Sequence, residues 1–216
     1  MRVCLFRHFG MARHSITKSL PPVKDMAFHF ETQNVLLRPF AIEDLASLRA
    51  LLNDPEVSGR RYLPESFSEH LPLSAPQVSR LIETWQNPEN ALWLAVCAPE
   101  SPALVGYVYA AWHWDPHCPS VGVVIAPACR RQGYGRAVLN AILTCLFDDT
   151  PAHVVQVEVA DWNEPGRAFA QAMGFQPAGA MRWAGLRAGQ PFDMLAFDLL
   201  RSEWCARREE PHATGG

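Results

Sequence analysis

The stretch CRRQGYGRAV, residues 129–138, places two glycines and three arginines between an apolar segment and a helical pattern. VGVVIA (121–126) precedes it, and VLNAILTCLF (138–147) follows it with apolar residues at helical spacing. Glycine costs about 1 kcal/mol relative to alanine in a helix interior. Two glycines at this junction therefore indicate that it needs bare backbone, and the arginines indicate that it needs positive charge.

A helix N-terminus attracts anions because its first N–H groups lack intrahelical partners and the helix dipole is positive there. Gly133 and Gly135 have no Cβ, so a bulky anion can approach this backbone closely. Arg130, Arg131 and Arg136 add positive charge around the same point. The junction therefore predicts a phosphate or pyrophosphate ligand.

The composition favours a single soluble domain. The chain has 216 residues, 49% of them hydrophobic, and a formal net charge of −3. Broad attraction to nucleic acid or to a membrane surface would need a strong basic excess, so we expect neither partner. No apolar run approaches the ~20 residues that a membrane helix needs. The six scattered cysteines form no CxxC pair, which is typical of reduced thiols and predicts a cytoplasmic protein.

The segment HWDPHC (113–118) contains two histidines, an aspartate and a cysteine that could bind a metal. It has no distant second half at ligand spacing, so we expect a polar loop and no metal. Residues 1–26 carry five basic residues and one acidic residue, without a helical or strand period. They predict a disordered or misassigned extension, although their composition also resembles a transit peptide. We expect the folded domain over 27–204 and a polar tail over 205–216.

The hydrophobic pattern predicts alternating groups of strands and helices. Three consecutive strands separated by short breaks favour antiparallel neighbours, and a strand reached across a helix makes a βαβ unit. The predicted strands are 33–40, 91–97, 103–114, 120–126, 153–160, 175–182 and 191–200, and the predicted helices are 41–54, 74–85, 134–147 and 163–174. This order predicts an α/β protein with a mixed sheet and helices on its faces.

Two nucleotide-binding motifs do not fit the junction. The dinucleotide fingerprint needs Gly or Ala at position 138, where Val stands, and the P-loop needs a Gly-Lys-Ser/Thr run that is missing. What remains is Arg-x-x-Gly-x-Gly between an apolar strand and a helix, which resembles the acetyl-CoA motif of the GNAT superfamily of N-acetyltransferases. LLRPFAIEDLASLRALLNDPEV (36–57) resembles the N-terminal arm of the branch that acetylates ribosomal-protein N-termini. VEVADWNEPGRAFAQAMGF (157–175) resembles the superfamily's second cofactor strand and the helix after it.

The resemblance extends over residues 31–204 and implies the GNAT fold, a central twisted mixed sheet of six or seven strands flanked by about four helices. It implies acetyl-CoA as co-substrate, with its pantetheine arm between strand 120–126, which usually carries a bulge, and strand 153–160. By carry-over, the arm and the pyrophosphate contact Val123, Val124, Ile125, Arg130, Arg131, Gln132, Gly133, Tyr134, Gly135, Arg136 and Asn163. Asn163 could equally be a helix cap, and the two roles can coexist.

Two departures from the family pattern concern catalysis. Relatives often place a carboxylate where this chain has Ser120, and a Ser or Tyr where it has Gly166 and Ala170. The remaining candidates for the catalytic base are Glu158, His113 and Asp115, with Ser120 in the usual position of the base.

The resemblance implies acetyl transfer to a primary amine, either a protein N-terminus or a small molecule. A non-catalytic acyl-CoA-binding or regulatory domain is the alternative that these departures leave open. A homodimer is the default expectation for the assembly.

Overall fold

The computed structural model describes residues 30–31, 34–58, 72–99, 101, 103–113, 115–187 and 189–209. The extension predicted over residues 1–26 lies outside this part of the chain, and so does most of the irregular segment between the first two predicted helices. Among the described residues, no helix is both long enough and apolar enough to cross a membrane.

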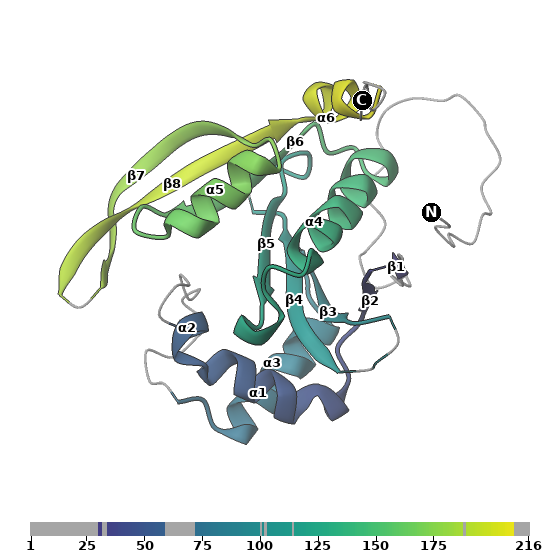
Figure 1. The fold of residues 1–216 in the computed structure, drawn as a ribbon, viewed down its shortest axis with the longest axis vertical. Helices are drawn as coiled ribbons and strands as arrows, with labels where there is room; N and C mark the ends of the chain where they lie inside the picture. The colour runs from purple at the N-terminus through teal and green to yellow at the C-terminus, as the bar shows by residue number, and fades with distance from the viewer. Residues whose placement is uncertain are drawn as a thin grey trace.

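A mixed sheet forms the centre of the molecule (Figure 1). Its eight strands are β1 Phe30–Glu31, β2 Leu36–Arg38, β3 Ala91–Cys97, β4 Leu104–Ala111, β5 Ser120–Ile125, β6 Val154–Ala160, β7 Gln176–Arg187 and β8 Gln190–Leu200. They lie in the order β1-β2-β3-β4-β5-β6-β8-β7. Only the β5–β6 pair is parallel in this described sheet, as the βαβ prediction requires. The predicted fold class is therefore confirmed, with a short β1 added at one edge.

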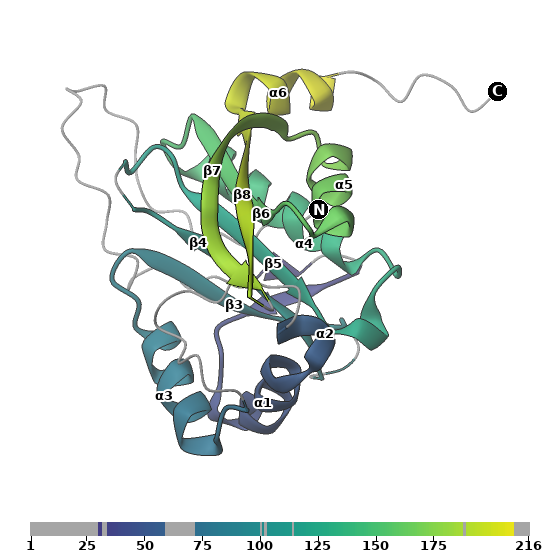
Figure 2. The ribbon, with the colours of Figure 1, turned by 90° about the vertical axis from the view of Figure 1, so that its left-hand side faces the viewer.

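Helices cover both faces of the sheet, and each face has its own core. The helices are α1 Leu45–Asn53, α2 Pro55–Ser58, α3 Ala75–Gln86, α4 Tyr134–Thr144, α5 Glu164–Ala172 and α6 Arg201–Glu209. Leu48 and Ile82 bring α1 and α3 against one face, around the buried ring of Tyr107. Ile142 and Ala170 bring α4 and α5 against the other face. Figure 2 shows α4 and α5 together on one side of the sheet, away from α1 and α3.

Local sequence signals explain where the helices begin and end. Pro55 separates α1 from the single turn of α2, because a proline cannot continue the hydrogen-bond ladder of α1. Ser74 caps α3 with the expected capping box, in which the Gln77 side chain accepts from the Ser74 N–H at 2.8 Å. The apolar stripe predicted for α4 is buried, as the positions of Val138 and Leu143 illustrate.

The C-terminal half differs from the sequence prediction in two places. β7 and β8 form a longer hairpin than expected, because pairing continues through Arg187 and Gln190 on either side of the turn. Residues 205–209, expected in a polar tail, continue α6. The hydrophobic period missed this helix because six of its nine residues are polar or charged. Trp204 attaches it to the core and is buried against Phe147 with ring centroids 6.1 Å apart.

A buried ion pair fixes the entry to α1. Nη1 and Nη2 of Arg38 each donate to the Asp44 carboxylate at 2.7 Å, and the Ala41 N–H donates to it at 2.8 Å. Asp44 is only 5% exposed. Burial raises the pKa of Asp44, but the hydrogen bonds from Arg38 and Ala41 outweigh it and hold the pKa below its usual value.

We expect Asp44→Asn to lower the free energy of unfolding by about 2–3 kcal/mol at pH 7, because Arg38 loses its charged partner. A carboxyl with a lowered folded pKa stabilises the fold above its unfolded pKa near 3.9 and loses that effect as pH falls. The gap between wild type and Asp44→Asn in urea denaturation should therefore be full at pH 7 and shrink below about pH 4. A gap that stays constant down to pH 3 would assign the loss to packing instead of charge.

Candidate functional site

The sheet divides between β5 and β6. These two strands pair at Ser120 and Gln156, where the Gln156 N–H donates to the Pro119 carbonyl at 2.9 Å. Beyond that point β5 follows β4 up to Ile125, whereas β6 follows β8 up to Ala160. Each strand therefore keeps its own antiparallel neighbour, and the sheet opens between them. The register of β4 with β5 has no shift, so the bulge that the family resemblance implied in β5 is absent from the described pairing.

A cleft of about 720 Å³ occupies this opening. Ten of the predicted site residues line it, namely Val123, Val124, Ile125, Arg130, Arg131, Gly133, Gly135, Arg136, Glu158 and Asn163. The others lie outside its lining: Gln132, Tyr134, His113, Asp115 and Ser120. Its lining extends from Val57 to Met194 and includes residues of β5, of β6, and of α4 and α5, the helices that follow these strands.

The N-terminus of α4 lies at the open end of the cleft and has the backbone of an anion-binding turn. Gly133 is its N-cap at φ 86° and supplies no capping side chain, so the first N–H groups of the helix keep their capacity to donate. Arg131 also has a positive φ, 63°, which is uncommon outside glycine and found at functional turns. Alternation of this kind lets successive N–H groups converge on an anion. A Cβ added at Gly133 would meet nothing within 4 Å, so the backbone is open to a ligand.

The three arginines at this end have different surroundings. Arg130 donates from Nε to the Ile125 carbonyl at 3.2 Å and from Nη1 to Glu56 Oε2 at 2.8 Å, so it joins β5 to α2. Arg131 and Arg136 are exposed on the lining of the cleft. Positive charge at the mouth therefore comes most directly from Arg131 and Arg136, while Arg130 is partly neutralised by an acidic partner.

Two other predicted contacts have local structural roles. The Gln132 side chain donates to the Ala128 carbonyl at 3.0 Å and closes the turn before α4. The Asn163 side chain accepts from the Gly166 N–H at 3.2 Å as the N-cap of α5, and Asn163 also lines the cleft. Both interpretations of Asn163 therefore fit the same position. Tyr134 packs against the core on the α4 side of the sheet.

The catalytic candidates are not gathered at one point. Glu158 is exposed on β6 and lines the cleft. Ser120 pairs with Gln156, and side chains alternate along a strand, so Glu158 and Gly122, each two residues further on, lie on the same side of the sheet. Ser120 is half-buried at the end where β5 and β6 still pair. His113 is exposed in the loop after β4 and does not line the cleft. Glu158 is thus the candidate with access to a ligand in the cleft.

Sequence reasoning missed the aromatic residues of the cleft. Trp93, Tyr107 and Tyr109 line it from β3 and β4, and Val57 lines it from α2. The register pairs Tyr109 with both Trp93 and Gly122. A Cβ added at Gly122 would lie 2.2 Å from Tyr109 Cε1, so the Tyr109 ring leans over β5 where Gly122 leaves room. The sequence already predicted β4 and β5 as antiparallel neighbours, and aligning the two strands residue by residue could have placed Tyr109 opposite Gly122.

In the HWDPHC loop, Asp115 and His117 interact with each other. Asp115 Oδ1 accepts from the His117 N–H at 2.7 Å and lies 3.0 Å from His117 Nδ1. The backbone N–H of His117 and then its ring hold the pKa of Asp115 below its usual value. In the described part of the chain no three His, Cys, Asp or Glu side chains are grouped so as to bind a metal.

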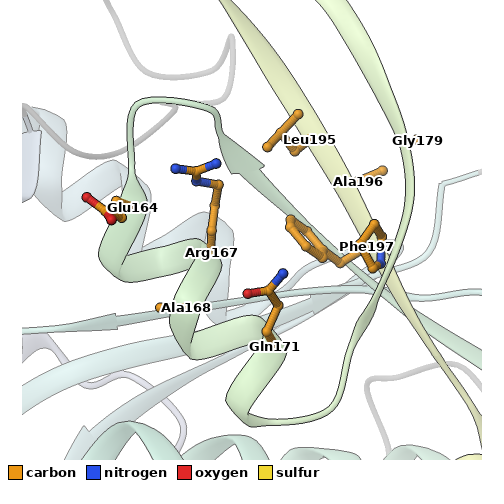
Figure 3. Close-up of a pocket in the computed structure, with 9 residues that line it drawn as sticks. Glu164, Arg167, Ala168, Gln171, Gly179, Leu195, Ala196 and Phe197 are labelled. Carbon is orange, nitrogen blue, oxygen red and sulfur yellow. The ribbon is translucent and has the colours of Figure 1, made fainter.

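A second hollow of about 410 Å³ lies between α5 and the β7–β8 hairpin. Figure 3 shows Arg167 and Gln171 of α5 on one side of it and Leu195, Ala196 and Phe197 of β8 on the other. None of the predicted site residues lines this hollow. The cleft between β5 and β6 is therefore the candidate site.

A family model for the acetyltransferase (GNAT) domain matches residues 34–176. The chain belongs to the GNAT acetyltransferase family. The match covers the α4 junction, α5 and all of the cleft lining except Met194 of β8. The branch that acetylates ribosomal-protein N-termini is a finer assignment than this match supports.

Solved acetyltransferases have the same fold. An acetyltransferase (GNAT family) from Bacillus anthracis is 16% identical at a TM-score of 0.70, covering 82% of this chain and 100% of its own. A probable GNAT-family acetyltransferase from Chromobacterium violaceum is 19% identical at a TM-score of 0.70, covering 92% of this chain and 99% of its own. Spermidine N-acetyltransferase from Vibrio cholerae, solved in complex with CoA and spermine, is 18% identical at a TM-score of 0.68, covering 79% of this chain and 98% of its own.

Proposed function

We propose that this protein transfers an acetyl group from acetyl-CoA to a primary amine. The observation that supports it best is the cleft between β5 and β6, with the glycine-containing N-terminus of α4 at its mouth. The family membership and the CoA bound in the similar Vibrio cholerae enzyme support the same co-substrate. Acetyl-CoA supplies a thioester whose acyl carbon an amine can attack.

The residues at the mouth fit the charge and shape of a pyrophosphate. The N–H groups from Arg131 to Arg136 would hold it, because this backbone turns through two left-handed positions and no side chain covers Gly133. The side chains of Val123 and Ile125 pack against the core on the α4–α5 side of the sheet. The edge of β5 that faces the cleft would hold the pantetheine arm beside Asn163. The arm would run toward Gly122, which places the reacting carbon near Glu158 and Tyr109.

The chain's part in the reaction is mainly positioning. Good orientation alone contributes about 7–11 kcal/mol to lowering a barrier of this kind. Glu158 is the candidate to take a proton from the amine, through a water where the distance requires it. Three finer expectations stay predictions: a protein N-terminus as acceptor, a cytoplasmic location and a homodimer.

Thiol release from acetyl-CoA with a library of primary amines tests this proposal. Turnover with at least one amine, with stoichiometric acetylated product, is the expected result. Saturable binding of acetyl-CoA without thiol release from any amine would favour the non-catalytic alternative. Failure to bind acetyl-CoA would remove the co-substrate assignment as well.

Glu158→Gln should lower turnover by less than the ~10²-fold minimum typical of a dedicated general base. The reason is that Glu158 is exposed, and that an α-amine with a pKa near 8 is already partly neutral at pH 7.5. An alkyl amine near 10.4 is mostly protonated and should react more slowly. The rate should rise with pH along the titration of whichever amine is used. A pH profile that stays fixed when the amine is changed would show that an enzyme group governs the step.

A further inference from the structure

We propose that the acceptor is a primary amine carried one or two carbons from an aromatic ring. This inference rests on the proposed acetyl transfer and names the substrate class for the same cleft. It comes from the wall of the cleft on the α1–α3 side of the sheet, which we call the aromatic wall. Its members are Trp93, Tyr107 and Tyr109, with Trp85 of α3 behind them.

The rings of the aromatic wall are stacked on one another. Trp85 and Trp93 lie parallel at 2° with centroids 4.4 Å apart, and Trp93 and Tyr109 stack at 27° with centroids 4.6 Å apart. Both faces of Trp93 are therefore covered by neighbouring rings, so Trp93 meets the cleft with its edge. Ring edges are electropositive and ring faces electronegative. An edge attracts the face of another ring, whereas it offers little to a cation, which binds over a ring face.

The wall is held rigid from behind. Trp85 is buried and contacts Phe40 and Tyr107 with ring centroids 5.0 and 5.4 Å apart. Tyr107 is itself buried against α1 and α3. A wall that is fixed before the ligand arrives loses little conformational entropy on binding. The aromatic wall is thus a preformed surface for a flat apolar group.

The charges of the cleft argue against a polyamine. Among the described residues that line it, Glu158 is the single carboxylate, against Arg130, Arg131 and Arg136. A chain with several ammonium groups would need several anionic partners, and Glu158 alone supplies one. The Tyr109 ring fills the space over Gly122, so one amine would lie beside that ring, between Tyr109 and Glu158, with its aromatic group against Trp93.

Matched amine pairs test this inference with the full-length chain and acetyl-CoA. The first pair is phenylalaninamide and alaninamide, two α-amines that differ by a phenyl group. The second is 2-phenylethylamine and butylamine, and the third is a Phe-Ala-Ala-Ala-Ala peptide and pentaalanine. We expect kcat/KM to be at least ~10-fold higher for the aromatic member, since a single methylene in an apolar pocket already changes kcat/KM by about 10-fold or more. Spermidine should react more slowly than 2-phenylethylamine.

The pairs also separate the two sources of this chemistry. A preference in the peptide pair alone would assign a protein N-terminus, and a preference in the small-amine pairs alone would assign a free arylalkylamine. Trp93→Leu should bring the phenylalaninamide to alaninamide ratio down toward 1. A rise in Tm with acetyl-CoA in that variant checks that it is folded.

Failure of the inference and failure of the proposed function give different results. Equal or better turnover of alaninamide, butylamine and spermidine would overturn the aromatic acceptor and leave acetyl transfer standing. The absence of thiol release with every amine, while acetyl-CoA still raises the Tm, would overturn the proposed function itself.

Discussion

Gly133→Ala is expected to abolish the rise in Tm that acetyl-CoA produces in the wild-type protein. Gly133 caps α4 at φ 86°, and its Cβ would point into the open space at the mouth of the cleft, where the pyrophosphate is proposed to bind. Ligand at 100 times its Kd stabilises a folded protein by about 2.7 kcal/mol, so the effect in wild type is easily measured by thermal unfolding. In the variant we expect at least a 100-fold weaker Kd.

Gly189→Ala is the matched control for backbone strain. Gly189 also has a positive φ, 77°, and a Cβ there also meets nothing within 4 Å, but it lies beside the β7–β8 turn and outside the cleft. Both variants should lose about 1–2 kcal/mol of stability without ligand, because alanine is strained in the left-handed region. Only Gly133→Ala should lose the response to acetyl-CoA. If acetyl-CoA failed to raise the Tm of both variants, or raised the Tm of both, the pyrophosphate assignment would be contradicted.

The fold was predictable where local signals agree with one another. The glycines and arginines of residues 129–138 marked the junction between β5 and α4, and the apolar spacing from Val138 onward predicted the buried side of α4. Short proline-containing breaks predicted the antiparallel run from β3 to β5. The polar α6 was missed, because its attachment through Trp204 depends on tertiary contacts that a period cannot reveal.

The candidate site was predictable for its anion-binding end and less so for its acceptor end. The anion-binding end is a local motif at the start of α4, so its residues are adjacent in the sequence. The acceptor end combines Trp93, Tyr109, Gly122 and Glu158 from four different strands. Their proximity depends on strand register and on the divergence of β5 from β6, and both are set by pairing over long sequence separations. The Arg130–Glu56 ion pair joins residues 74 positions apart and was missed for the same reason.

Gly122→Ala is expected to lower kcat/KM for the amine by at least ~10²-fold while acetyl-CoA still raises the Tm. The added Cβ would lie 2.2 Å from Tyr109 Cε1 and 2.7 Å from the Tyr109 hydroxyl oxygen, so the ring must leave its position. A displaced ring disturbs the stack with Trp93 and moves into the place proposed for the amine beside it. A displacement of about 1 Å at a reacting centre is enough for a loss of this size. The N-terminus of α4 is unchanged by this substitution, so acetyl-CoA should still bind.

Gly179→Ala is the matched control, since Gly179 is also a strand glycine but has nothing within 4 Å of an added Cβ and lies outside the cleft. It should keep the activity of the wild type. A double-mutant cycle then identifies the cause of the Gly122 effect. Gly122→Ala should cost about 1–3 kcal/mol of stability by overpacking, and much less in a Tyr109→Ala background, where the ring is gone. Equal costs in both backgrounds would contradict the contact between Gly122 and Tyr109, and full amine turnover in Gly122→Ala would contradict the placement of the amine beside the Tyr109 ring.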